Sequence, residues 1–339
     1  MFDDPPPFQT DALVVPGGHV LRLTQHGASQ GVPVLLLHGG PGSGCSPLLR
    51  RFFNPDHWRM VCVDQRGAGA SRPAGGVQHN TTAHLLADLR QVRQHLHIPR
   101  WWVVGGSWGA TLAVAHAADA PDAVAGLLLR ASFLARAADV AGFFQRSTAN
   151  SPAATAAWDA LAALLPQASG QPLLPSIARV MTVQPAGAAQ YQLAAAWWAW
   201  EQALSGGTSA GTAPDTTPGP APTGPALDAQ VARYRVQSHY LQHGCWLQSP
   251  SLLGLAARVP RVPTLLLHGT ADHICPPDGA QALQQALPHS RLQWVAGAGH
   301  DPTHPAMTAA MLAALRQAAS TGGFAGAQDR TPAAPAATP

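Results

Sequence analysis

Uninterrupted apolar runs divide the first 130 residues into predicted strands. Runs of this kind, without alternation of apolar and polar positions, are typical of parallel strands buried on both faces. They occur at residues 32–37, 59–63, 101–104 and 124–129. Residues 82–97 carry Leu and Val at helical spacing, and two short apolar runs within residues 11–24 predict a β-hairpin. We therefore predict an α/β fold with a mostly parallel central sheet and helices on both faces.

The pattern changes at about residue 131. From 131 to 242 the chain carries Ala, Gln, Leu and Trp at helical spacing and offers no strand candidate, which predicts an inserted helical cap. Within this insertion, residues 205–225 are rich in Gly, Pro, Thr and Ala and nearly uncharged. A disordered or extended loop is expected there.

Sheet patterning returns at residues 263–269 and 291–295, and a helix is predicted over 304–318. The predicted organisation is a core in two parts, with the cap between them and a disordered tail at the end, rich in Ala, Pro, Thr and Gly. The corresponding ranges are 1–130 and 243–320 for the core, 131–242 for the cap and 321–339 for the tail.

Composition narrows the range of partners. Charged residues make up 11% of the chain, against about 25% in ordinary domains, and 46% of the residues are hydrophobic. The formal net charge of +3 arises from scattered Arg, without the basic runs that mark nucleic-acid or membrane-surface patches. We therefore expect neither a nucleic acid nor a membrane as partner, and the composition leaves the oligomeric state open.

The four cysteines are far apart and form no Cys-x-x-Cys motif, so their spacing indicates neither a zinc site nor a thioredoxin-type site. We expect reduced, mostly buried thiols. The first residues carry no signal-peptide pattern, and no stretch approaches 18 uninterrupted apolar residues. A cytoplasmic location is the corresponding expectation.

The apolar run at 101–104 breaks into Gly105-Gly106-Ser107-Trp108-Gly109 and then resumes at helical spacing. A Gly-x-Ser-x-Gly sequence between a strand and a helix is typical of a nucleophile elbow, where the glycines leave room for a strained turn that exposes the serine. A glycine-rich turn with an incidental serine is the alternative, but the strand before it and the helix after it favour the elbow. Ser107 is therefore the predicted nucleophile.

Two ionisable residues follow the later predicted strands, Asp272 after 263–269 and His300 after 291–295. In open α/β sheets, ligands bind at the carboxyl ends of the strands. The chain order Ser, Asp, His is that of the α/β-hydrolase triad, so Asp272 and His300 are the predicted acid and base. Asp64 is a second acidic candidate, but it precedes the serine and Arg66 lies close enough in the loop to pair with it, which favours a structural role.

With 16 histidines in the chain, position has to select the functional one. His38 and His268 also end predicted strands, but each directly precedes a glycine in a turn, where a structural hydrogen bond is expected. The histidines lack H-E-x-x-H or similar spacing. We therefore expect no metal, and the predicted acyl-enzyme chemistry needs no cofactor.

Residues 39–44 have the glycine spacing of a phosphate-binding loop. Cys45 stands where a Walker motif needs lysine, and Pro47 interrupts a Gly-x-Gly-x-x-Gly fingerprint that begins at Gly42, so both nucleotide-binding interpretations fail. Free backbone N–H groups in such a turn can instead stabilise an oxyanion. The predicted oxyanion hole combines Gly40 of this turn with Trp108, the residue after the nucleophile.

Taken together, these motifs resemble the proline iminopeptidases (prolyl aminopeptidases) of the α/β-hydrolase superfamily, over most of residues 5–318. The resemblance implies a serine aminopeptidase that releases N-terminal proline from short peptides through an acyl-enzyme. It is carried by His38-Gly39-Gly40-Pro41-Gly42, Asp64-Gln65-Arg66-Gly67-x-Gly69-x-Ser71, Gly105-Gly106-Ser107-Trp108-Gly109, Trp200-Glu201, and the Asp272 and His300 loops.

In that family, acidic cap residues bind the free amino terminus of the substrate. Trp200-Glu201 matches the family's Trp-Glu, so the resemblance makes Glu201 the candidate ammonium acceptor. The second acidic position aligns with Gln237, where the family pattern Arg-Ile-Glu-Asn-His-Tyr has glutamate. Gln237 still accepts a hydrogen bond but supplies no charge, so a less exclusive preference for N-terminal proline is expected.

Two other functions remain open on the sequence. A carboxylesterase or lactonase would act on an uncharged substrate and would leave Glu201 as a solvated or structurally paired carboxylate. A non-catalytic binding protein of the same fold is disfavoured, because all three residue types of the triad are in place.

Overall fold

The computed structural model describes residues 1–146, 151–165, 172–183, 185–205 and 224–324. The predicted loop at 205–225 lies outside these ranges except for its first residue and its last two, and the predicted tail lies outside them from residue 325 onward.

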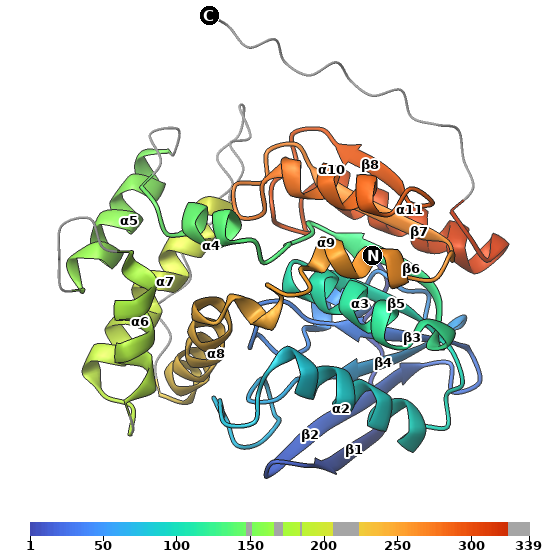
Figure 1. The fold of residues 1–339 in the computed structure, drawn as a ribbon. Coiled ribbons are helices and arrows are strands. Elements are labelled where there is room, and N and C mark those ends of the chain that lie inside the picture. The colour runs from blue at the N-terminus through green and yellow to red at the C-terminus, as the bar shows by residue number, and fades with distance from the viewer. Residues whose placement is uncertain (147–150, 166–171, 184, 206–223, 325–339) are drawn as a thin grey trace, which may run out of the picture.

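The predicted sheet is confirmed as an 8-stranded sheet in the order β1-β2-β4-β3-β5-β6-β7-β8 (Figure 1). Pairing is antiparallel between β1 and β2 and between β2 and β4, and parallel from β4 to β8. The strands are β1 Pro7–Val15, β2 His19–Gly27, β3 Val32–Leu37, β4 Trp58–Val63, β5 Trp101–Gly106, β6 Val124–Arg130, β7 Thr264–Gly269 and β8 Arg291–Val295. The predicted hairpin is therefore β1 and β2, extended at both ends.

Helices cover both faces of this sheet, which explains its uninterrupted apolar runs. In β3, Leu35 and Leu37 face the side covered by α2, α3 and α10, whereas Val34 and Leu36 face the side covered by α11. The core helices are α1 Pro47–Arg50, α2 Thr82–His95, α3 Trp108–Asp119, α9 Leu252–Leu255, α10 Pro277–Ala286 and α11 Pro305–Thr321, with 3₁₀ turns at Pro121–Ala123, Gly244–Trp246 and Ala256–Arg258.

The helices within residues 137–242 form a block at the left of Figure 1, beside the core. Helix α5 packs on α7, and α6 packs on α8. The Trp197 ring of α7 stacks on the Tyr234 ring of α8, with centroids 4.5 Å apart. These helices are α4 Ala137–Phe143, α5 Pro152–Ala163, α6 Leu173–Thr182, α7 Ala188–Ser205 and α8 Pro225–Gln242.

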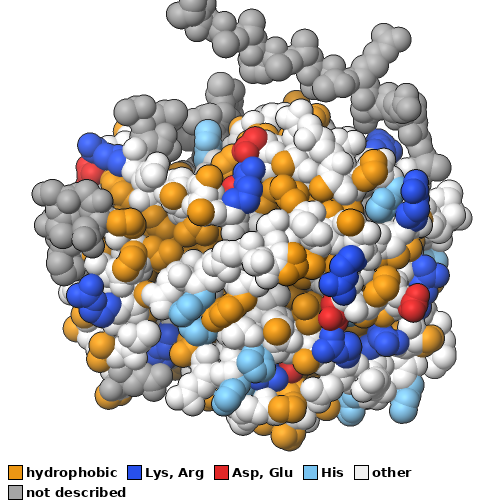
Figure 2. Space-filling view, in the orientation of Figure 1, with side chains coloured by type: hydrophobic (Ala, Val, Ile, Leu, Met, Phe, Trp, Pro, Cys, Tyr) orange, Lys and Arg blue, Asp and Glu red, His pale blue; other side chains and the backbone are white. Residues whose placement is uncertain are grey.

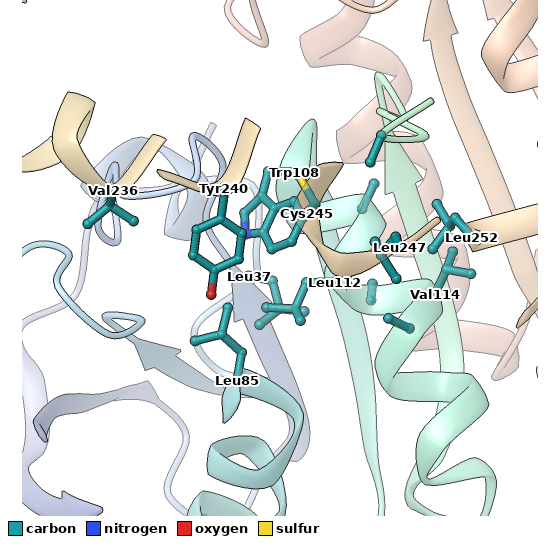
Figure 3. Close-up of a cluster of buried hydrophobic side chains, with 14 of the residues drawn as sticks. Leu37, Leu85, Trp108, Leu112, Val114, Val236, Tyr240, Cys245, Leu247 and Leu252 are labelled. Atoms are coloured by element: carbon teal, nitrogen blue, oxygen red, sulfur yellow. The ribbon is translucent and has the colours of Figure 1, made fainter. Parts of the chain in front are cut away.

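Helix α8 connects this block to the core (Figure 3). Its Tyr240 ring meets the Trp108 ring of α3 edge to face, with centroids 5.1 Å apart. The Tyr240 hydroxyl donates to Asn80 Oδ1 over 2.8 Å. Both rings are fully buried, so α8 is fixed against the first turn of α3.

Charged side chains are sparse on the surface, as the composition predicts. In the view of Figure 2, Lys and Arg side chains are scattered among apolar and neutral ones, and several lie beside acidic side chains. Among the described helices, none has both the length and the apolar character that crossing a bilayer requires.

Candidate active site

Ser107 lies at the turn between β5 and α3. Its backbone has φ +57° and ψ −126°, a conformation that residues with a side chain rarely adopt. The turn depends on the flanking glycines, because a Cβ on Gly105 would lie 2.2 Å from the carbonyl oxygen of Gly109, and a Cβ on Gly109 would lie 2.2 Å from that of Leu37. The sequence prediction of a strained elbow thus has a steric basis.

Asp272 and His300 come from the loops after β7 and β8 and meet each other. His300 Nδ1 and Asp272 Oδ2 are 2.8 Å apart. The other carboxylate oxygen, Oδ1, accepts the backbone N–H groups of Ile274 and Cys275. Burial would raise the pKa of Asp272, but His300 and the Cys275 N–H outweigh it and lower this pKa to about 2. Asp272 is therefore an anion that binds the Nδ1 edge of the His300 ring.

The structure gives His38 and His268 hydrogen bonds to main-chain groups, in line with the structural role expected for them. His38 accepts the backbone N–H of Gln65 at Nε2 over 3.0 Å, and its Nδ1 lies 2.9 Å from the Gly39 carbonyl. His268 Nε2 lies 2.9 Å from the Cys275 carbonyl. Burial lowers the pKa of both rings, which favours their neutral forms.

The expected pairing of Arg66 with Asp64 is wrong. Arg66 instead forms a bidentate pair with Asp88 of α2, with distances of 2.6 and 2.7 Å. Asp64 accepts the backbone N–H groups of Cys45 and Ala70 and so ties its own loop to the loop after β3. The contacts of the Asp64 carboxylate therefore still favour a structural role, but its partners are main-chain N–H groups and not Arg66.

Of the two predicted oxyanion donors, Trp108 directly follows Ser107 in the chain, and Gly40 belongs to a turn that passes close to it. Trp108 is the first residue of α3, and N–H groups in a first helical turn have no acceptor within the helix. A Cβ added to Gly39 would lie 3.5 Å from the Ser107 Cβ, so the Gly39-Gly40 turn passes directly beside the serine. Gly40 has φ +111°, a backbone conformation that suits glycine.

The cap contributes Glu201 from α7 and Gln237 from α8, and these side chains contact each other. Gln237 Nε2 donates to Glu201 Oε1 over 2.7 Å. Glu201 Oε2 accepts from Arg233 Nη2 at 2.6 Å and from the Tyr234 hydroxyl at 2.9 Å. The sequence analysis missed Arg233, although its spacing of four residues from Gln237 places both on one face of a helix.

A cavity of about 290 Å³ joins these groups. Ser107, His300 and Gly40 line it from the core, and Glu201, Arg233 and Gln237 line it from the cap. Two further lining residues were not predicted from the sequence: Arg130, whose Nη1 donates to the His300 carbonyl over 2.7 Å, and Cys275, whose Sγ lies 4.0 Å from Ser107 Oγ. Burial raises the pKa of the Cys275 thiol and keeps it protonated. Among the described residues, no group of three or more His, Cys, Asp or Glu is arranged to hold a metal ion.

Comparison with known proteins identifies the family of this chain. The sequence profile of the α/β hydrolase fold matches residues 32–304. A proline iminopeptidase from Xanthomonas citri is 36% identical over 320 residues, covering 94% of this chain and 97% of that protein. A probable proline iminopeptidase from Leptolyngbya boryana is 35% identical over 317 residues, covering 91% and 92%. The chain belongs to the proline iminopeptidase family of α/β hydrolases. The resemblance seen in its motifs is thereby confirmed.

Solved structures support the fold alone, because their sequence identities are low. VinJ matches with a TM-score of 0.64 and 18% identity, over 92% of this chain and 99% of that one. The esterase RhEst1 from Rhodococcus sp. ECU1013 matches with a TM-score of 0.59 and 19% identity, over 93% and 99%. The chain thus shares its fold with these proteins.

Proposed function

We propose that this protein is a serine aminopeptidase that releases N-terminal proline from short peptides, in keeping with its membership of the proline iminopeptidase family. The observation that carries the proposal is a single cavity with the strained Ser107 and the His300–Asp272 pair on the core side and the carboxylate of Glu201 on the cap side. A nucleophile and an amine acceptor on opposite walls suit a substrate whose scissile bond lies one residue from its amino terminus.

In the proposed reaction, His300 takes the proton of the Ser107 hydroxyl as the serine oxygen attacks the substrate carbonyl carbon. Asp272 holds the imidazole tautomer and stabilises the imidazolium that forms. The proton then passes to the leaving amine, and the C–N bond breaks to give an acyl-enzyme. Water, activated by the same histidine, hydrolyses this ester and regenerates the serine.

The negative charge on the carbonyl oxygen needs donors at the tetrahedral stage. The backbone N–H of Trp108 and that of Gly40 take this role in the proposal. Removing one such donor typically costs about 10²–10³ in kcat, so the rigid packing of Trp108 against Tyr240 contributes to rate as well as to stability.

We assign residues 131–242 as the cap and the flanking segments, 1–130 and 243–320, as the core. In this assignment, Glu201 and Gln237 bind the free amino terminus of the substrate. All four cysteines are free thiols, which suits a reducing compartment, and we place the reaction in the cytoplasm.

A carboxylesterase or lactonase is the second candidate, and one observation favours it. Glu201 is paired with Arg233 at 2.6 Å, as expected for a structural carboxylate rather than one reserved for a ligand.

Turnover of L-proline β-naphthylamide and of p-nitrophenyl butyrate separates the two candidates. We expect the wild-type protein to have the higher kcat/KM on the proline amide. We also expect Glu201→Gln to raise KM for the amide strongly and to leave the ester unaffected, because the ester has no amine. Equal loss on both substrates would favour the esterase, and absence of turnover on both would favour a binding protein.

A further inference from the structure

Glu201, the proposed acceptor of the substrate amine, already has charged and neutral partners within the cap. Both carboxylate oxygens are already occupied, Oε2 by Arg233 and Tyr234 and Oε1 by Gln237. The Glu201 side chain is only 10% exposed and that of Arg233 only 29%, so water screens this pair weakly. Burial would lower the pKa of Arg233, but the Glu201 carboxylate raises it, and the guanidinium stays charged.

The rest of the cavity supplies no compensating negative charge among its described lining residues. Arg130 from β6 adds a second guanidinium to the cavity lining. The imidazoles of His38 and His300 also line the cavity, from the core side. Asp272 lies behind His300 and is paired with it. A protonated amine that approaches Glu201 therefore meets a carboxylate whose charge Arg233 has already balanced.

Gln237, unlike Glu201, has a side-chain oxygen that no described residue occupies. Its Nε2 is held by Glu201, and this fixes the amide so that Oε1 is left buried without a hydrogen-bond partner among the described residues. Gln237 lines the cavity, and its Oε1 lies just beneath the cavity surface, so an N–H group of a ligand reaches this oxygen once the side chain turns toward it. A buried acceptor left without a partner is destabilising, and a ligand N–H would supply the missing hydrogen bond.

Resting on the proposed placement of the substrate amine beside Glu201, we propose that Arg233 is a specificity-determining residue of this enzyme. Its guanidinium neutralises the amine-binding carboxylate, so the pocket selects the acyl group by shape and by one neutral hydrogen bond to Gln237. The substrate class then extends from N-terminal proline peptides to amides and esters of uncharged five-membered-ring acids of the same shape.

The test compares two ligands that the enzyme does not cleave. L-prolinol carries a ring amine, which is protonated at pH 6.5 because amines of this kind have pKa values of about 8 or above. Cyclopentylmethanol has the same shape and no amine. Dissociation constants measured by calorimetry at pH 6.5 give the amine preference, the ratio of the two, without any need for turnover.

For the wild type we expect a small amine preference. Arg233→Met leaves the Glu201 charge free for the ligand, and the preference should rise about tenfold, equivalent to about 1.4 kcal/mol. Arg233→Lys keeps the positive charge and should keep the wild-type preference. Arg235→Met is the matched control on the same helix, because Arg235 donates to the Met181 carbonyl and does not line the cavity.

An unchanged or lower preference in Arg233→Met would overturn the proposal, because Arg233 would then orient Glu201 or contact the ligand itself. If Arg233→Met fails to fold, Arg233→Gln, which can still donate to Glu201, is subject to the same expectation. Failure of the proposed function is a separate result, since it is seen as a lack of proline amide turnover by the wild type, whereas this test measures binding alone.

Discussion

The backbone of Ser107, the proposed nucleophile, has a conformation that costs free energy. Residues forced into sparsely populated regions cost about 1–3 kcal/mol each and persist only where the surroundings determine them. Here the β5–α3 turn determines the conformation of Ser107. The Ser107 N–H donates to the Arg130 carbonyl over 2.9 Å, and the flanking glycines are packed closely against neighbouring backbone. The hydroxyl is positioned before any substrate binds, at the expense of stability.

Two substitutions at this residue separate chemistry from strain. Ser107→Ala should abolish hydrolysis and leave the free energy of unfolding nearly unchanged, because alanine carries the same Cβ into the same strained turn. Ser107→Gly should be equally inactive but about 1 kcal/mol more stable, because glycine relieves the strain at the cost of its own chain entropy. Turnover on the better substrate and urea denaturation measure the two effects. Substantial kcat in either variant would exclude Ser107 as the nucleophile.

Two substitutions test whether Asp272 or Asp64 is the acid of the proposed triad. Asp272→Asn should reduce kcat by about 10⁴, as the same change does in serine proteases, because the amide favours the wrong imidazole tautomer. Asp64→Asn should leave kcat within a few-fold, since the Asp64 carboxylate accepts main-chain N–H groups from its own loop and from the loop after β3. Steady-state kinetics of both variants decide the point, and the reverse ranking would show that the triad is misassigned.

At the scale of elements, a buried ion pair fastens the loop after β4 to α2. Arg66 and Asp88 have side chains only 1% and 3% exposed, and Arg66 also donates to the His79 carbonyl. Burial raises the pKa of Asp88 against the opposing effect of Arg66, so the pair is held at a desolvation cost. Removing one partner would leave the other as a buried, uncompensated charge.

Asp88→Ala should therefore lower the free energy of unfolding by about 3–5 kcal/mol. The double variant Arg66→Met/Asp88→Leu should lose less, because no unpaired charge remains. Asp159→Ala is the matched exposed control: its partner is Arg146, both side chains are more than half exposed, and we expect a loss below about 1 kcal/mol. Urea denaturation compares the three, and similar losses at Asp88 and Asp159 would contradict the argument.

At the scale of the whole molecule, burial makes stability depend on pH through His116. This residue of α3 is fully buried, and its Nε2 accepts the indole N–H of Trp101 over 3.1 Å, which requires the neutral ring. Burial lowers the pKa of His116 to about 4. The unfolded chain binds a proton near pH 6.5 while the folded chain does not, so stability falls as pH falls from 6.5 to 4.

The expected loss from this one residue is about 3 kcal/mol across that interval, with no further change below pH 4. Other buried histidines titrate as well, so the quantity to measure is the difference between the wild type and His116→Gln in unfolding free energy at pH 7, 5.5 and 4. Glutamine can accept the Trp101 bond but does not titrate. A difference that stays constant with pH would show that His116 is not the group responsible.

The sequence alone determined the features that depend on local geometry. Apolar runs such as 32–37 predicted strands because a strand buried on both faces has no polar positions to show. The elbow was predictable because glycine at 105 and 109 is a steric requirement of a turn only a few residues long. The chain order of Ser107, Asp272 and His300 predicted that all three lie at one edge of the sheet, where the carboxyl ends of parallel strands meet. The structure brings Asp272 and His300 into contact and places Ser107 and His300 in the lining of one cavity.

Only the tertiary structure decided which charged side chains pair. Arg66 lies two residues from Asp64 but binds Asp88, 22 residues away, because α2 brings that carboxylate to the buried guanidinium. Arg233 reaches Glu201 across 32 residues through the packing of α7 on α8. Such pairs depend on side-chain direction and on desolvation, and neither is encoded by spacing along the chain. For the same reason, the family motif pointed to Glu201 as the carboxylate that we propose binds the substrate amine, whereas the ion pair of Glu201 with Arg233 followed from the packing of the cap.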